Sequence, residues 1–218
     1  LQQVSEEFQR MVEEFFLVQS RYSAAIKEIQ TKLEILDDEF QMRHRRNPIH
    51  HMQSRLKTIQ SMLEKLKRKN YEVSINSAVK NLQDIAGIRV ICSYVQDVYT
   101  IANLLVSQDD VHLVRMADYI REPKPNGYRS LHLIVEIPVF LSEGRILVPV
   151  EVQIRTIAMD FWASLEHSLR YKAQEYIPQH ISDELQRVAT DIASLDQRMQ
   201  AIHDQVDELS DARSDNAT

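Results

Sequence analysis

Hydrophobic positions in the first 40 residues recur at every third or fourth place, without a Gly or Pro to interrupt them. Phe8, Phe15, Tyr22 and Ile29 are members of this series. Because an α-helix turns once in about 3.6 residues, the spacing gathers these side chains on one side. The pattern predicts one long amphipathic helix, or two that abut. It ends at the proline of "RRNPIHH" (45–51), since proline cannot continue the helical hydrogen bonds.

A second helix is predicted for "SRLKTIQSMLEKLKRK" (54–69). At about 100° per residue, one side of this helix is apolar and the opposite side is basic. The apolar side holds Leu56, Ile59, Leu63 and Leu66. The polar side holds Ser61, Lys65 and Arg68, with Lys57 near it. We therefore expect a helix that buries its leucines and presents its cations.

The middle of the chain has the β-branched and alternating patterns that are typical of strands. Four strands are predicted, at 88–92, 111–116, 130–137 and 146–155. A helix at 97–106 joins the first two, and "SEGR" (142–145) is typical of a hairpin turn. Pro138 and Pro149 are expected at strand ends, edges or bulges, because proline lacks the N–H that a strand ladder uses.

The last third is again helical. A helix over 156–172 has Thr156 as its candidate cap. Its apolar positions are Ile157, Phe161, Leu165 and Leu169. From Leu185 to Leu209 the apolar spacing alternates three and four, as in a coiled coil that pairs with the first helix or with another subunit. The fold class is therefore α+β, with helices at both ends of a central mixed sheet.

The length and composition fit one globular unit. With 218 residues, 44% hydrophobic and 27% charged, the chain is long enough for one ordinary domain with extra helices. We expect an N-terminal helical segment at 1–42, a central domain at 43–175, and the heptad-patterned helix with a tail at 176–218.

Cysteine usage and hydropathy indicate the compartment. The single cysteine, Cys92, excludes an intramolecular disulfide framework and favours a reducing cytosol. No stretch reaches the roughly 18–20 apolar residues that a membrane helix needs. The polar start "LQQVSEEFQR" does not resemble a signal peptide either. We expect a cytoplasmic protein without a membrane partner.

The charge is unevenly distributed. The net charge of −6 argues against nucleic-acid binding by the whole surface. Residues 43–69, however, hold nine Lys or Arg and one acid, whereas the chain from Asp183 onward holds nine acids and three Arg. A basic segment in an acidic protein indicates a local polyanion site, although a solvated basic helix face gives the same pattern.

Two carboxylates stand out by their position. Asp84 comes just before a buried strand, and Glu151 lies inside another. Alternation along that strand places Val and Ile on one face and Glu151, Gln153 and Arg155 on the other. Because an unpaired buried acid is costly, Glu151 is expected to face a cleft, a metal or a cation. A salt-bridged acid on a solvated sheet face is the alternative.

The segment "KPNGYRSLH" (124–132) combines a glycine with an aromatic ring and three groups that can meet an anion. The glycine lets the loop turn. If the strand begins near Tyr128, this residue points the same way as Ser130 and His132. An aromatic ring beside cations is typical of nucleotide binding, since the ring stacks on the base while the cations meet phosphates. The loop by itself is a weak motif.

Four motifs together carry a resemblance to a known family. They are "SRLKTIQSMLEKLKRK" (54–69), "NLQDIAGIRVIC" (81–92), "YIREPKPNGYRSLH" (119–132) and "EVQIRTIAMDFWASLEH" (151–167). With this order and these intervals, the chain from about residue 43 to 172 resembles the small alarmone synthetases, single-domain relatives of the bifunctional Rel/Spo proteins. It is most similar to their RelP-type branch. The resemblance implies a nucleotidyltransferase-like sheet, Mg²⁺ as cofactor, and a homotetramer. It also implies transfer of pyrophosphate from ATP to the 3′-hydroxyl of GTP or GDP, which gives AMP and (p)ppGpp.

The resemblance also implies roles for individual residues. Asp84 and Glu151 would be the catalytic pair that holds Mg²⁺, with Glu151 helping to deprotonate the 3′-hydroxyl. ATP would be bound by Arg55, Lys57, Ser61, Lys65, Arg68 and Arg89. GTP or GDP would be bound by Lys124, Tyr128, His132, Gln153 and Asp160, with the Tyr128 ring stacked on guanine. Asp160 departs from the Asn that relatives carry there, and an ionised Asp can only accept hydrogen bonds.

Three other functions are compatible with parts of the sequence. A nucleotidyltransferase that transfers NMP would share the fold, but such enzymes commonly have two acids two residues apart, and Asp84 is followed at that spacing by Ala86. A coiled-coil oligomer could bind RNA through residues 43–69, and RNA binding is expected at most as a secondary property. The "HD" at His203–Asp204 lacks the upstream histidines of a hydrolase, so hydrolysis is not expected.

Overall fold

The computed structural model describes residues 2–173 and 177–215. The N-terminal part contains α1 (Gln2–His44), β1 (Ile49–Leu56), α2 (Ile59–Arg68), α3 (Ile75–Asn81), β2 (Ala86–Cys92) and α4 (Val95–Val106). The rest contains β3 (His112–Asp118), β4 (Leu131–Leu141), β5 (Gly144–Thr156), α5 (Ile157–Lys172) and α6 (Gln179–Asp215). The α+β class is therefore confirmed. None of the helices in the described residues is long and apolar enough to cross a membrane.

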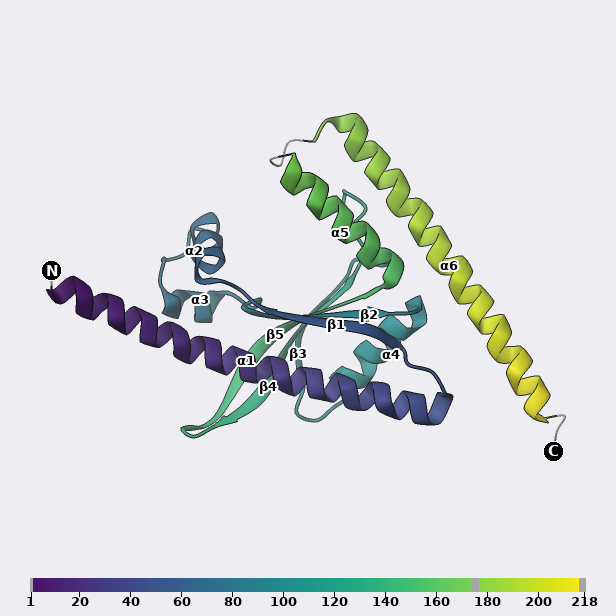
Figure 1. Ribbon diagram of the computed structural model, residues 1–218, viewed down its shortest axis with the longest axis horizontal. Coiled ribbons are helices and arrows are strands. Elements are labelled where there is room, and N and C mark those ends of the chain that lie inside the picture. Colours follow the sequence, from purple (N-terminus) through teal and green to yellow (C-terminus); the bar gives the residue numbers. More distant parts are fainter. Residues whose placement is uncertain (1, 174–176, 216–218) are drawn as a thin grey trace.

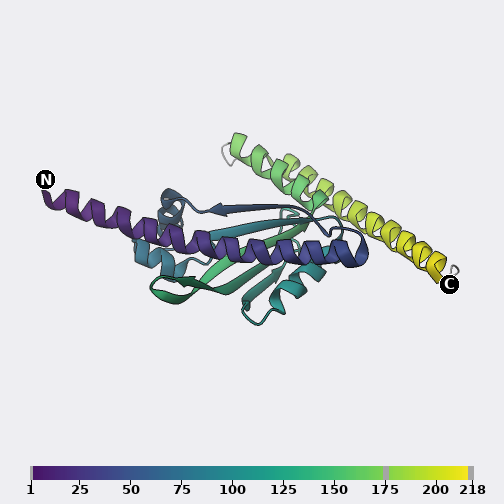
Figure 2. The ribbon, with the colours of Figure 1, turned by 60° about the horizontal axis from the view of Figure 1, so that its bottom comes forward.

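The five strands form one mixed sheet in the order β1-β2-β5-β4-β3. The central pair, β2 and β5, is parallel, and the other neighbours are antiparallel. Helices α1 and α4 cover one face, which Figure 1 shows below the sheet, while α5 lies above it and α6 runs from α5 down past the end of the sheet toward α4. Turning the molecule brings α1 to the front, where it runs along the sheet (Figure 2). The two faces of the sheet therefore have different neighbours.

The alternation of β5 decides which side chains belong to the core. Val150, Val152 and Ile154 are fully buried in the cluster that also contains Ile29 and Leu33 of α1. Since successive strand residues point to opposite faces, the intervening side chains point toward the α5 side. The predicted separation of β5 into an apolar and a polar face is confirmed. The predicted amphipathic helix of the first 40 residues is confirmed as well, although the side chain of Phe8 lies outside the described part.

The predicted helix at 54–69 was wrong in its first turn. Residues up to Leu56 belong to strand β1, and α2 begins only at Ile59, with the Thr58 hydroxyl accepting from the N–H of Ser61 as its cap. The strand escaped prediction because it is the edge of the sheet and only Ile49 is buried in it. An edge strand with few apolar residues does not produce a clear alternating pattern.

Pro138 and Pro149 lie inside strands β4 and β5, at positions where each strand has a paired neighbour on one side only. Pro138 pairs with Leu147 and Pro149 pairs with Glu136 in the β4–β5 hairpin. Strand β3 pairs with β4 only as far as Glu136, and β2 pairs with β5 only from Val150. The hairpin therefore extends beyond its neighbours at both prolines, where the ladder can tolerate a missing N–H.

The C-terminal helices α5 and α6 do not pack as their apolar patterns predicted. Thr156 caps α5, as predicted, by accepting from the N–H of Met159. The inward face of α5, however, holds Met159, Trp162, Ala163 and Glu166. The predicted apolar positions of α5 are exposed: Ile157, Phe161, Leu165 and Leu169. Helix α6 packs on α5 and α4 and lies away from α1 (Figure 1), so pairing with the first helix is wrong.

Candidate active site

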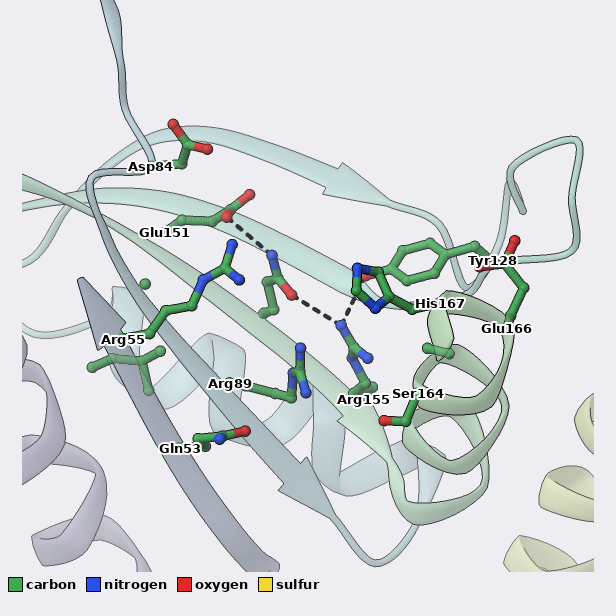
Figure 3. Close-up of a pocket in the computed structure, with 14 residues that line it drawn as sticks. Gln53, Arg55, Asp84, Arg89, Tyr128, Glu151, Arg155, Ser164, Glu166 and His167 are labelled. Atoms are coloured by element: carbon green, nitrogen blue, oxygen red, sulfur yellow. Dashed lines mark hydrogen bonds between the residues drawn. The ribbon is translucent and has the colours of Figure 1, made fainter. Parts of the chain in front are cut away.

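A cavity of about 520 Å³ lies on the sheet face that α1 does not cover. Its wall is built from β1, β2, β5, α5 and the loops before β2 and β4 (Figure 3). The lining residues are Gln53, Arg55, Asp84, Gly87, Ile88, Arg89, Tyr128, Glu151, Gln153, Arg155, Ala163, Ser164, Glu166 and His167. Six of them were predicted site residues: Arg55, Asp84, Arg89, Tyr128, Glu151 and Gln153.

Asp84 lies at one end of the cavity, between two lysines. Its Oδ2 accepts from Lys57 Nζ at 2.7 Å and from Lys65 Nζ at 2.5 Å. Burial pushes the pKa of Asp84 upward, but the two lysines outweigh burial and hold the pKa below its ordinary value. Its other oxygen, Oδ1, is buried and has no hydrogen-bond partner within the described residues. The carboxylate therefore has an unused acceptor.

Glu151 lies in the middle of β5, between Gly87 of β2 and Ile134 of β4. Its Oε2 accepts from Gln153 Nε2 at 3.0 Å, and its Oε1 lies 3.3 Å from Nδ1 of His132. Burial raises the pKa of Glu151, but the bonds to His132 and Gln153 outweigh burial and keep the pKa below its ordinary value. Glu151 is therefore ionised at neutral pH.

The residues fit a magnesium ion. Asp84 and Glu151 lie at the same end of the cavity (Figure 3), and the unpartnered Oδ1 of Asp84 is the kind of hard oxygen that Mg²⁺ prefers. No group of three or more His, Cys, Asp or Glu that could hold a metal exists in the described residues. Two carboxylates suffice for Mg²⁺, because it keeps waters and nucleotide oxygens as its other ligands.

Tyr128 enters the cavity from a tight turn. The N–H of Gly127 donates to the Lys124 carbonyl at 2.8 Å, and the N–H of Lys124 donates to the Tyr128 carbonyl at 3.1 Å. Lys124 Nζ lies 4.9 Å from the centre of the Tyr128 ring. The Tyr128 hydroxyl lies 2.8 Å from His132 Nε2. The aromatic ring and the cation of this loop are therefore adjacent, as the sequence indicated.

The predicted grouping of Tyr128, Ser130 and His132 is only partly correct. Strand β4 begins at Leu131, and the Ser130 hydroxyl is fully buried, donating to the Ile154 carbonyl. His132 lies opposite Gln153 on the neighbouring strand, hence on the same sheet face, and contacts Glu151 without lining the cavity. The Ser130 side chain therefore links the start of β4 to β5 and does not enter the cavity.

The other predicted site residues lie around the cavity. Lys57 and Lys65 reach it through Asp84, and Asp160 contacts Arg155 at 3.2 Å and Arg89 at 3.5 Å. Ser61 and Arg68 are exposed on α2 and do not line the cavity. Their roles toward ATP stay predictions.

Several lining residues were not among the predicted site residues. Gln53 belongs to the missed strand β1, and Ser164, Glu166 and His167 belong to α5, where only Glu166 of the three is buried. The apolar positions of α5 predicted the wrong side of that helix to face inward. Arg155 could have been found, because the alternation of β5 already placed it on the same face as Glu151.

Gly127 occupies a position that fits no other residue. Its φ is +91°, and a Cβ added there would lie 2.6 Å from the Cβ of Ala189 in α6. Backbone strain of this kind costs about 1–3 kcal/mol, to which the contact with α6 adds. Because the sequence predicts that Tyr128 stacks on a nucleotide base, we expect Gly127→Ala to displace the Tyr128 loop and to raise the KM for that nucleotide on the order of tenfold. Steady-state kinetics with that nucleotide varied would measure the change.

Gly144 provides the matched control. It also has a positive φ, +118°, but a Cβ there would meet nothing within 4 Å, and it lies in the β4–β5 turn outside the cavity lining. Gly144→Ala should therefore lower stability without changing the KM. Ala189→Gly should partly restore the Gly127→Ala variant. An unchanged KM in Gly127→Ala would show that the loop position does not depend on α6.

Comparison with known proteins places this site in context. Residues 54–176 match the family model described as the region found in RelA/SpoT proteins. The chain is 45% identical over 186 residues to the GTP pyrophosphokinase YwaC of Bacillus subtilis, an alignment that covers 85% of this chain and 89% of that relative.

Solved structures show the same fold. Small alarmone synthetase 2 of Bacillus subtilis superposes with a TM-score of 0.80 at 41% identity, covering 88% of this chain and 99% of the other. Small alarmone synthetase 1 bound to its product pppGpp gives 0.77 at 37% identity, with 85% and 94% covered. The same synthetase bound to AMPCPP gives 0.75 at 32% identity, with 90% and 99% covered. Similarity thus extends over most of the length of each protein.

Proposed function

Because the chain belongs to the RelA/SpoT family, and resembles its small alarmone synthetases over most of its length, we propose that it is a GTP pyrophosphokinase. It transfers the β,γ-pyrophosphate of ATP to the 3′-hydroxyl of GTP or GDP and releases AMP. The observation that carries the proposal is the cavity itself, which holds Asp84 and Glu151 together with cations and the Tyr128 ring. The sequence motifs of the chain favour the RelP-type branch of this family.

The cavity offers separate surfaces for the two nucleotides. Arg55 and Arg89, with Lys57 and Lys65 beside Asp84, form a cationic side that suits the triphosphate of ATP. Tyr128 provides a ring for the guanine base, with Lys124 close to that ring. Binding both nucleotides in one cavity holds the attacking hydroxyl near the phosphorus, which removes most of the entropic cost of their meeting.

The chemistry is then mostly orientation and charge. Glu151 is ionised and lies on the cavity wall, where it can accept the proton of the 3′-hydroxyl. Lys57 and Lys65 can turn from Asp84 to the phosphate oxygens when ATP binds. Mg²⁺, held by Asp84 and Glu151, would supply a charge that neutralises the transferred group.

Product analysis tests the proposal. Incubation with Mg²⁺, GTP or GDP, and ATP labelled at its β or γ phosphate should move the label to the guanosine nucleotide and leave AMP. Transfer of an α-labelled nucleotidyl group would support the NMP-transferring alternative. The absence of any labelled guanosine product with both acceptors would reject the proposal. ATP and GTP are cytosolic nucleotides, so we place the enzyme in the cytoplasm as part of this proposal.

We also propose a homotetramer, supported by the apolar side chains that α5 and α6 leave exposed. Phe161 and Leu165 of α5 are 59% and 49% exposed, and Leu195 and Ile202 of α6 are 49% and 53% exposed. Apolar side chains that recur on the exposed faces of two packed helices are typical of an interface between subunits.

The exposed helix face predicts an oligomer that charge can break. Phe161→Glu combined with Leu165→Glu should reduce the mass found by light scattering to that of a smaller assembly, because a carboxylate cannot be buried there unpaired. Leu113→Glu, at an exposed apolar position on β3, should leave the mass unchanged. A wild-type protein that is monomeric at micromolar concentration would contradict the proposal.

A further inference from the structure

Arg155 is the most enclosed cation of the cavity, and the proposed function gives it no task. Its side chain is 3% exposed, and it is the penultimate residue of β5, on the same face as Glu151. We propose that Arg155 is the positioning residue of the site: two chains of hydrogen bonds start at its guanidinium and converge on the two oxygens of Glu151. This inference rests on the proposed function for Glu151, and the arrangement can also be tested without turnover.

The first chain passes through Gln153. Arg155 Nη2 donates to Gln153 Oε1 at 2.9 Å, and Gln153 Nε2 donates to Glu151 Oε2 at 3.0 Å (Figure 3). Arg155 has only donors and the ionised Glu151 has only acceptors. A reversed amide would therefore set donor against donor at one end and acceptor against acceptor at the other. Arg155 thus fixes the orientation of the Gln153 amide and, through it, one oxygen of Glu151.

The second chain passes through Tyr128 and His132. Arg155 Nη2 donates to the Tyr128 hydroxyl at 3.0 Å, and this hydroxyl lies 2.8 Å from His132 Nε2. In the proposed arrangement the hydroxyl accepts from Arg155 and donates to Nε2. When Nε2 of a neutral histidine accepts, Nδ1 carries the proton. Nδ1 lies 3.3 Å from Glu151 Oε1. Both carboxylate oxygens are therefore held by donors, and each chain leads back to one guanidinium.

Asp160 anchors the other side of the guanidinium. Its Oδ1 lies 3.2 Å from Arg155 Nη1 and 3.5 Å from Arg89 Nη1. Burying a guanidinium costs free energy unless its N–H groups are hydrogen-bonded. Within the described residues, Asp160 is the one charged acceptor among the three side chains bonded to Arg155, because Gln153 and Tyr128 are neutral. Because the guanidinium is planar and rigid, its three acceptors hold fixed positions relative to one another.

The arrangement couples recognition to chemistry. Tyr128 is the ring proposed to stack on guanine, and Glu151 is the proposed base, yet both are oriented by the same side chain. Removing Arg155 should therefore affect the acceptor and the chemical step together, and should leave ATP binding nearly unchanged. A misplacement of the catalytic group by about 1 Å can cost on the order of 10²-fold in rate.

Kinetics of Arg155→Met provide the first test. We expect kcat to fall about 10–100-fold and the KM for GTP or GDP to rise, with the KM for ATP changed less than about twofold. Arg155→Lys, which keeps the charge but loses the planar fork, should recover only part of the rate. Arg115→Met, an exposed arginine on β3 outside the cavity, is the control. An active wild type together with an unchanged kcat in Arg155→Met would overturn the inference.

A combined variant separates positioning from direct contact. Gln153→Met with Tyr128→Phe removes both chains and keeps the aromatic ring. Adding Arg155→Met to this pair should lower kcat by less than about threefold, because residues that act as one unit are not additive. A further tenfold loss would mean that Arg155 contacts the substrate itself, and the positioning role would be rejected.

The protonation of His132 gives a readout that does not need activity. In the ligand-free protein labelled with ¹⁵N-histidine, the His132 signal, assigned with His132→Gln, should report a proton on Nδ1 and none on Nε2. Arg155→Met should change this signal while the melting temperature confirms a folded protein. A proton on Nε2 in the wild type would overturn the second chain, whatever the outcome of the proposed reaction.

Discussion

Replacing Glu151 by Gln should lower kcat for pyrophosphate transfer by about 10²–10⁴-fold, the usual contribution of a positioned general base. The amide has nearly the same shape as the carboxylate, but it cannot accept the hydroxyl proton and is a poor ligand for Mg²⁺. The pKa of Glu151 is held below its ordinary value, so the wild-type charge that is lost is present throughout the neutral range. Single-turnover assays with saturating ATP and GTP would measure the loss.

The fold should survive this change. Glu151 is half-buried, and its two oxygens face Gln153 of the cavity wall and His132 beside it. The oxygen of a glutamine amide can keep one of these two contacts. Glu136→Gln is the matched control, because Glu136 is a half-buried glutamate on β4 that does not line this cavity. Near-normal turnover in a well-folded Glu151→Gln protein would remove Glu151 from the proposed chemistry.

Asp84→Asn should be nearly as damaging, for a different reason. The substitution takes a negative charge from between Lys57 and Lys65, each within 2.7 Å of Oδ2. It also leaves one side-chain oxygen where Asp84 has two, so the lysines and the metal can no longer each have their own. We expect kcat/KM for ATP to fall about 10²–10³-fold, because the loss of one metal ligand and of charge balance together removes about 3–4 kcal/mol of transition-state stabilisation. The Mg²⁺ concentration for half-maximal activity should also rise.

A magnesium titration of the variant and the wild type would measure both effects. Asp110→Asn is the control, since Asp110 also pairs with a lysine, Lys32 at 2.8 Å, but lies outside the cavity. It should leave the kinetics and the magnesium dependence unchanged. If Asp84→Asn had the same magnesium dependence as the wild type, Asp84 would not be a metal ligand.

The sequence predicted six of the fourteen residues that line the cavity, and several of these follow simple periods. Glu151 and Gln153 share a strand face, and the alternation of two residues is enough to separate them from the buried valines. Asp84 was recognisable as a charge beside a buried strand. Resemblance to the synthetase motifs then gave these residues their roles, and the structure brings six predicted residues into one cavity.

The sequence could not reveal what depends on contacts between distant elements. Strand β1 is an edge with one fully buried residue, so its pattern is weak and Gln53 was missed. Glu166 is buried against Asn126 and Arg170, and Asn126 is 40 residues away from it in the sequence. The exposed face of α5 also shows that an apolar stripe identifies a surface to be covered, but not the element that covers it.

The support that α6 gives to the site bears on how the protein can be shortened. The family match ends at residue 176, yet the Trp162 indole donates to the Leu185 carbonyl and the Thr156 hydroxyl donates to the buried Asp196. A fragment that ends at residue 176 would lose both hydrogen-bond acceptors. It would also lose Ala189 of α6, which lies against the turn at Gly127. The smallest autonomous unit of this synthetase therefore extends at least to residue 196, and truncations or fusions should be planned beyond it.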